Sequence, residues 1–154
     1  MYAISFLYLF LMYSTGINND QPVQACMDFL KNVNCKPEHS EGFKKTGLSR
    51  TYNLEIGKSV RYEVVLFGGE EFIIQCCTED DFYPVRFKLI RPESGKVIYD
   101  NKYNDYIDNL NLQLDYTELL AVEISVEPKK FKIRKSKDGR ACIGMAIYMR
   151  EIYK

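Results

Sequence analysis

The chain has 154 residues, in which 21 lysine and arginine side chains balance 21 aspartate and glutamate side chains. This length favours one domain, which is large enough to bury a core of its own. Because the charges balance, no overall field favours a nucleic acid as partner, and we expect none. The single histidine and the absence of any Cys-x-x-Cys pair exclude the usual zinc spacing, so the sequence predicts no metal site and no cofactor.

The start of the chain differs from the rest. No charged side chain precedes Asp20, and an apolar run from Ile4 to Tyr13 ends in small residues up to Gly16. This run has the length of the apolar region of a signal peptide and is shorter than the ~20 residues of a transmembrane helix. We therefore predict a signal peptide over residues 1–16, no transmembrane anchor, and a periplasmic or secreted protein. The alternative is a buried first strand or helix of a cytosolic protein.

Residues 17–47 are expected to form a helix and a loop that lead into the β domain. Pro22 suits the first turn of a helix, and the helical pattern extends to Asn34. Apolar residues recur within it at the spacing of one helix face, and this stripe consists of Val23, Cys26, Met27 and Leu30. We expect this one short amphipathic helix to pack its stripe on a sheet.

Residues 48–154 are predicted to form one β-sandwich domain. Short segments alternate apolar and polar side chains between turn residues, as antiparallel strands with one buried face do. In the clearest segment every second residue is leucine, so Leu112 is expected in the core. The predicted fold is all-β, an antiparallel, jelly-roll-like β-sandwich with the short N-terminal α-helix packed on it. The eight expected strands are 52–56, 62–66, 72–77, 85–89, 97–99, 109–115, 120–126 and 141–149.

Two of these segments are apolar on both faces and are predicted to be central strands. They are residues 72–77 and 141–149. The second contains Gly144, which suggests that another element, such as the N-terminal helix, approaches its backbone closely.

Five cysteines follow the apolar start, which allows at most two disulfides in an oxidising compartment. Cys76 and Cys77 are neighbours on a predicted strand, so one should belong to the core and the other should face outward. If the helix crosses the closing strand, Cys26 can meet Cys142 and tie the two ends of the chain together. Cys35 is the competing partner for Cys26, and all five cysteines can equally stay reduced.

Two runs of the chain resemble a known sandwich family. Residues 57–74 and the turn at 95–101 are similar to the opening strands and a later turn of pre-peptidase C-terminal and GOLD-like domains. The layout of leader, cysteine-bearing helix, sandwich and closing Cys-x-Gly strand is also similar to small exported proteins of Bacteroidetes-type bacteria. The resemblance covers about residues 22–150. It implies a sandwich fold and an extracytoplasmic location, and it assigns no functional residue.

A candidate ligand site lies between the sixth and seventh expected strands. Its tyrosine rings can stack on a sugar while amide and carboxylate groups bind the hydroxyls, as in other concave ligand sites. The alternative is that the first tyrosine is a core residue and the rest is a polar connection. The residues of this candidate site are Tyr99, Asn101, Tyr103, Asp105 and Tyr106.

Two charged segments are further candidates. Residues 129–140 hold seven basic side chains against one acidic side chain and can bind the phosphates of a lipid or nucleic acid, or a polyanionic glycan. The alternative is a solvated hairpin or a lysine-guarded edge strand. The acidic loop at 78–81 can supply oxygens to calcium, or it is simply solvated. The predicted anion-binding residues are Lys129, Lys130, Lys132, Arg134 and Lys135.

The sequence therefore favours a non-catalytic exported interaction module. Its partner is expected to be an envelope component, a glycan or another protein. We expect no enzyme, because a single histidine in a loop leaves no Ser/His/Asp or Cys/His set. The alternative is a glycan- or calcium-dependent ligand-binding domain, and a weaker one is a small hydrolase using two carboxylates.

Overall fold

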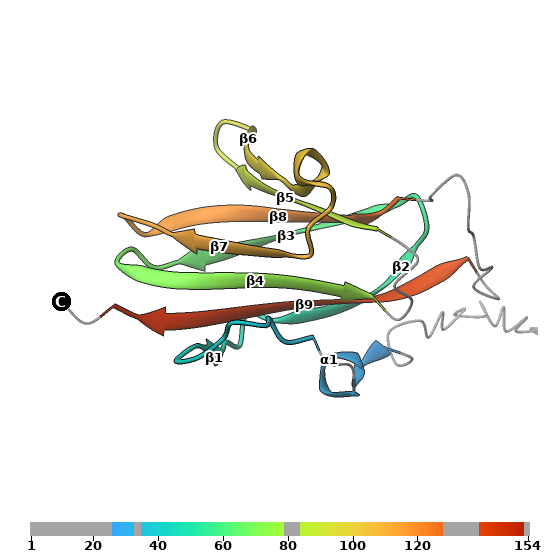
Figure 1. Ribbon diagram of the computed structural model, residues 1–154. Coiled ribbons are helices and arrows are strands. Elements are labelled where there is room, and N and C mark those ends of the chain that lie inside the picture. Colours follow the sequence, from blue (N-terminus) through green and yellow to red (C-terminus); the bar gives the residue numbers. More distant parts are fainter. Residues whose placement is uncertain (1–25, 33–34, 79–83, 128–138, 153–154) are drawn as a thin grey trace, which may run out of the picture.

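The protein is an antiparallel β-sandwich with one short helix (Figure 1), as the sequence predicts. The structure, a computed structural model, describes residues 26–32, 35–78, 84–127 and 139–152. No helix in this described part is long and apolar enough to cross a membrane. Its elements are α1 (Phe29–Asn32), β1 (Lys44–Lys45), β2 (Arg50–Glu55), β3 (Ser59–Leu66), β4 (Glu70–Thr78), β5 (Val85–Arg91), β6 (Lys96–Asp100), the 3-10 helix η2 (Asn101–Asn104), β7 (Asn109–Gln113), β8 (Glu118–Val126) and β9 (Arg140–Glu151).

The strands form two sheets that face each other. The first has the order β1-β9-β4-β7, and β2 pairs with β9 further along the same edge as β1. The second has the order β3-β8-β5-β6. All eight expected strands are present, and β1 is the one described strand within a segment for which the sequence predicts a loop. Two residues are too few to show any alternation, and β1 exists because its backbone pairs with β9.

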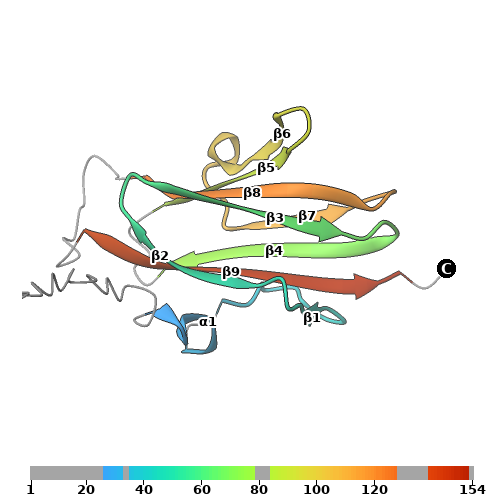
Figure 2. The same ribbon diagram turned by 180° about the vertical axis from the view of Figure 1, so that it is seen from behind.

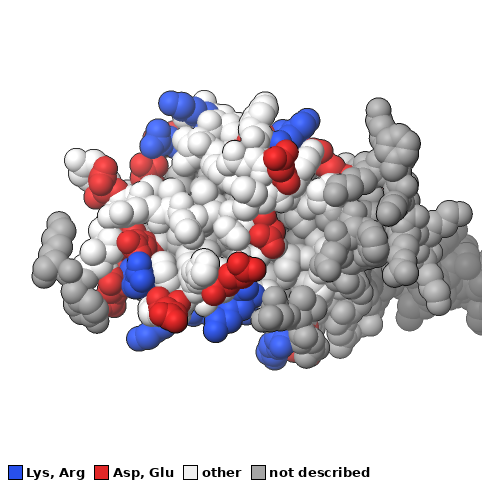
Figure 3. Space-filling model, in the orientation of Figure 1, with Lys and Arg blue, Asp and Glu red and all other residues white. Residues whose placement is uncertain are grey.

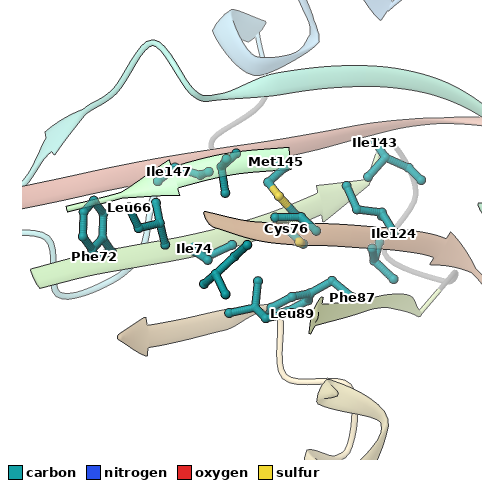
Figure 4. Close-up of a cluster of buried hydrophobic side chains, with 14 of the residues drawn as sticks. Leu66, Phe72, Ile74, Cys76, Phe87, Leu89, Ile124, Ile143, Met145 and Ile147 are labelled. Atoms are coloured by element: carbon teal, nitrogen blue, oxygen red, sulfur yellow. The ribbon is translucent and has the colours of Figure 1, made fainter. Parts of the chain in front are cut away.

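The core lies between the sheets and follows the alternation of the strands. In β4 every second side chain points into it: Phe72, Ile74 and Cys76. From β5 in the opposite sheet come Phe87 and Leu89 (Figure 4). These side chains are almost fully enclosed, and such burial is the main favourable contribution to folding.

The leucine-rich segment is less buried than expected. It forms β7, the edge strand next to β4, and its one buried leucine is Leu114, just after the strand. Leu112 packs on the core but remains partly exposed. The alternation correctly predicts which face turns inward, but it cannot show that an edge strand receives neighbours from one side only.

The most enclosed strand is β9, which is buried on both faces over eight consecutive residues from Ala141 to Tyr148. Its inner face meets the second sheet, whereas Ala146 and Tyr148 on the outer face pack with Ile73 and Cys35. The prediction of a central strand with two apolar faces is therefore confirmed.

The N-terminal segment covers the outer face of β9, and Figures 1 and 2 show α1 and β1 on that side of the first sheet. The described helix is much shorter than the predicted one, and residues 22–25 of the prediction lie outside the described part. The predicted apolar stripe is only partly correct. Cys26 is buried, but Met27 is 65% exposed, and Phe29 is buried instead. A helix of one turn does not keep the register that the longer helix required.

Two disulfides fix this segment to the sheet. Cys26 bonds to Cys142 on β9 with a Cα–Cα distance of 5.5 Å, which is the pairing expected if the N-terminal segment crosses the closing strand. Cys35 bonds to Cys77 on β4 with a Cα–Cα distance of 5.8 Å, a pairing that the sequence did not single out. The adjacent Cys76 is a buried core residue, so the prediction that these neighbours face opposite sides is confirmed.

Gly144 allows the N-terminal segment to approach this closely. A Cβ atom at this position would lie 2.4 Å from Leu30 Cδ2 and 2.9 Å from Cys77 Sγ. Both distances are shorter than van der Waals contact, so a side chain would push the covering segment away from β9.

We predict that Gly144→Ala destabilises the fold by about 1–3 kcal/mol, because overpacking must shift Leu30 or the second disulfide. Equilibrium urea unfolding with both disulfides intact measures the change. Gly47→Ala is the matched control, since a Cβ atom there meets nothing within 4 Å. Equal unfolding midpoints for the two variants would contradict the close packing at β9.

Candidate functional site

The loop predicted to bind a ligand instead secures one end of the second sheet. Asn101 is fully buried, and its Oδ1 accepts a hydrogen bond of 2.9 Å from the Phe87 backbone N–H. Its Nδ2 donates to the carbonyl oxygens of Val85 at 2.8 Å and Ile107 at 3.1 Å. Three hydrogen bonds satisfy this buried amide and join β5 to the loop. No surface of Asn101 is left for a ligand.

The other predicted residues of the loop point in different directions. Tyr99 packs its ring on Phe87, with ring centroids 5.3 Å apart, and Tyr103 projects outward with 83% exposure. Asp105 and Tyr106 both have positive φ angles, and the Tyr106 hydroxyl donates a hydrogen bond to Glu127. The structure therefore does not assemble these five residues into one concave site. The alternative of a core tyrosine followed by a polar connection describes the loop better.

An ion-pair cluster on β5 holds the same loop. The Arg86 guanidinium donates to both carboxylate oxygens of Asp100, at 3.0 and 2.6 Å, and to Glu127 at 3.0 Å. Only 6% of the Asp100 side chain is exposed. The hydrogen bonds from Arg86 hold the pKa of Asp100 below its ordinary value of 3.8.

Asp100 should therefore contribute to acid sensitivity. A lowered pKa in the folded state stabilises the fold above the unfolded pKa near 4, and this contribution is lost as the pH falls through the folded value. We predict that the free energy of unfolding of wild type exceeds that of Asp100→Asn at pH 6 and that this difference becomes smaller by pH 3. Urea unfolding at both pH values measures the difference. The control is Asp115→Asn, at an exposed position. The same difference in the free energy of unfolding at both pH values would contradict a stabilising role of the ion pair.

The predicted charged segments fall almost wholly outside the described residues. This is so for the anion-binding side chains at 129–135 and for positions 79–81 of the acidic loop. Among the residues that the structure does describe, no group of three or more potential ligands could hold a metal ion.

A surface that the sequence does not predict lies where β3 ends and β8 begins, at the left end of Figure 1. We call it the apolar tip and define it as Phe67, Tyr116 and Leu119, which are 56%, 79% and 44% exposed. Phe67 lies in the turn between β3 and β4, whereas Tyr116 lies in the loop between β7 and β8.

Gly68 brings the two turns of the tip together. Its backbone N–H donates to Thr117 Oγ1 at 3.1 Å, and a Cβ atom at Gly68 would lie 2.6 Å from the Tyr116 backbone. Only glycine fits this approach. The two aromatic side chains are therefore carried by turns that pack against one another.

Two hollows lie at the end of the sandwich that carries the apolar tip. The first, of about 600 Å³, lies between the N-terminal segment, the start of β4 and the ends of β7 and β9. In it the Arg150 guanidinium is ion-paired with Glu71 and lies over the Phe43 ring, 4.5 Å from its centroid. The second, of about 320 Å³, is bounded by the turn between β5 and β6 and includes Leu119 of the tip.

Both hollows carry more acid than base. The first is lined by three glutamates and one arginine, and the second by two glutamates and one arginine. In the second, Arg91 binds both oxygens of Glu118 at 3.0 Å, and this contact lowers the pKa of Glu118. Because each arginine is already paired with a glutamate, the remaining charge is negative. Figure 3 shows acidic side chains interspersed with basic ones at this end.

The sequence holds one signal for the tip. Phe67 and Tyr116 are aromatic residues placed directly beside turn residues, where burial does not require them. Their proximity could not be inferred, because 49 positions separate Gly68 from Thr117, and only the pairing of β3 with β8 brings them together.

No family model matches the chain, and no curated protein matches it, so the resemblance to pre-peptidase C-terminal and GOLD-like domains stays a prediction. Among solved structures, the chain is similar to the periplasmic inhibitor of g-type lysozyme from Aeromonas hydrophila. That match has 9% sequence identity and a TM-score of 0.44, and it covers 74% of this chain and 93% of the other. A likeness of this degree carries no inference about function.

Proposed function

We propose that this protein is an exported, disulfide-braced β-sandwich that acts by binding another protein and not by catalysis. The observation that carries the proposal is the apolar tip, where two mutually packed turns expose aromatic side chains at the end of the sandwich that also carries two acidic hollows. Aromatic residues are enriched in the centres of protein interfaces, and a polar rim usually surrounds them.

The disulfides support export. Four of the five cysteines form two pairs, although the sequence places the members of each pair 116 and 42 positions apart. Structural disulfides persist in oxidising compartments and are rare in the cytosol. The uncharged start of the chain supports the same location, because it has the pattern of a signal peptide.

The fifth cysteine is unsuited to nucleophilic chemistry. Cys76 is enclosed by the core, and this burial raises the pKa of its thiol far above the ordinary value. A reactive cysteine requires the opposite, a lowered pKa and access to solvent. This observation supports a binding role for the protein over a thiol-dependent activity.

The charge around the tip indicates the kind of partner. An excess of glutamate in both hollows favours a protein whose contact surface combines an apolar centre with lysine or arginine at its rim. A glycan is less well supported as the partner. In the loop predicted to bind one, Asn101 forms hydrogen bonds within the protein and Tyr99 packs on the core.

If the protein is exported, the mature protein should contain two disulfides. Non-reducing peptide mapping of protein recovered from the periplasm or medium should find the Cys26–Cys142 and Cys35–Cys77 peptides and a new N-terminus near Ile17. In the chain-entropy model, linking two cysteines 116 positions apart contributes about 4–5 kcal/mol, so reduction should lower the unfolding midpoint strongly. Free thiols throughout, with Met1 retained, would contradict the proposed location.

If the apolar tip is the binding surface, its side chains should determine which protein binds to the immobilised chain. Immobilised wild type, incubated with the exported proteins of the same cells, should retain a partner that the double variant Phe67→Ser with Tyr116→Ser loses. Loss of two interface aromatics worth about 2 kcal/mol each would weaken the affinity by roughly a thousandfold.

The matched control for this experiment is Tyr103→Ser with Ile107→Ser. These side chains are 83% and 49% exposed, close to the 79% and 56% of Tyr116 and Phe67, and they lie outside the tip. Wild type and control should retain the same protein. Equal retention by the tip variant and the control would remove the tip from the proposed function.

A further inference from the structure

Strand β3 is an edge strand with no described neighbour on its outer side. It is the first strand of the second sheet, and all eight of its residues pair with β8 without a bulge. Figure 2 shows β3 on the side of this sheet that faces the viewer. One row of its backbone N–H and C=O groups is therefore available to another strand.

The other described edge strands are all shorter than β3. The longest of them is β2, which has six residues. β1 has two residues, both lysine, and β7 has five. β6 also has five, begins with Lys96, and is offset from β5 by an irregularity in register. Lysine, shortness and bulges are the usual means by which proteins prevent strands from adding to a sheet edge. β3 contains no lysine and no proline and is longer than these edges.

The side chains of β3 alternate between its two faces, and the outer face also carries the exposed apolar side chain of Val65. Val60, Tyr62 and Val64 turn toward the core, whereas Arg61 and Glu63 are exposed on the outer face. Neither charged side chain has an ion-pair partner among the described residues. On β8, Arg61 lies opposite Glu123, which is paired with Lys88, and Glu63 lies opposite Ala121. Pairing two copies of β3 can bring Arg61 and Glu63 directly opposite each other.

We propose that β3 pairs antiparallel with β3 of a second copy of this chain and forms a symmetric dimer with a continuous eight-stranded sheet. Tyr62 lies at the two-fold axis, opposite its equivalent. Arg61 then lies opposite Glu63 of the partner subunit, and the symmetry makes this contact twice. Val60 and Val64 meet in the same way on the inner face. Opposite charges directly across an antiparallel pair stabilise it.

The charges select this register over its neighbours. The two-fold axis must keep the inner faces together, so the pairing can shift only in steps of two residues. A shift of two residues in one direction places Arg61 opposite Arg61 of the second copy. A shift in the other direction places Glu63 opposite Glu63 of the second copy. Both alternatives oppose like charges, which destabilises the pair. A dimer of this form holds the two apolar tips at opposite ends of the assembly.

Sedimentation equilibrium of the mature protein tests the proposal through charge reversal. Wild type should associate to a dimer, and Arg61→Glu should weaken the dimer roughly tenfold or more, because two attractive contacts become repulsive. The double variant Arg61→Glu with Glu63→Arg should restore dimerisation, since the exchanged charges again oppose each other.

Lys96→Glu is the matched control, because it makes the same charge change on the other edge strand of this sheet. It should dimerise like wild type. Circular dichroism and urea unfolding confirm that each variant is folded. A monomeric wild type at all concentrations, an Arg61→Glu variant that dimerises normally, or a double variant that stays monomeric would each overturn the proposal. The tip variants should dimerise normally, so failure of this proposal and failure of the proposed function are distinguishable.

Discussion

The burial of β9 on both faces is the constraint on which the rest of the structure depends. This strand pairs with β1, β2 and β4, so it holds the first sheet together, while its inner side chains meet the second sheet. A strand with two apolar faces needs a cover on each side. The second sheet provides one cover, and the N-terminal segment provides the other.

That second cover is too small to hold itself in place by burial alone. Its helix has four residues, and isolated helices of that length are not stable in water. Gly144 provides the space that lets Leu30 reach the strand, and the two disulfides remove most of the freedom that the segment would gain by leaving it. A short segment with little surface to bury is thus kept on the sheet by covalent bonds.

The apolar tip, which we propose as the binding surface, is also held rigidly. The turns that carry Phe67 and Tyr116 continue directly from strands of the two sheets, and Gly68 packs them together. Aromatic side chains held in this way lose little conformational freedom when a partner covers them, which favours affinity. The loop at the other end of the sandwich differs, because the polar groups of Asn101, Asp100 and Tyr106 form hydrogen bonds within the protein itself. One end of the sandwich is therefore closed by its own side chains, whereas the other presents them.

The sequence by itself determined the β class, eight strands and the inward face of the alternating ones, because a period of two residues is a local property of the chain. It also determined that β9 is central and that Cys76 and Cys77 point apart. Only the tertiary structure decided that Leu112 lies at an edge, that Met27 is exposed, that Cys35 meets Cys77, and that Phe67 lies near Tyr116. These features depend on which strands become neighbours, and strand order is fixed by contacts between distant parts of the chain that no local pattern contains.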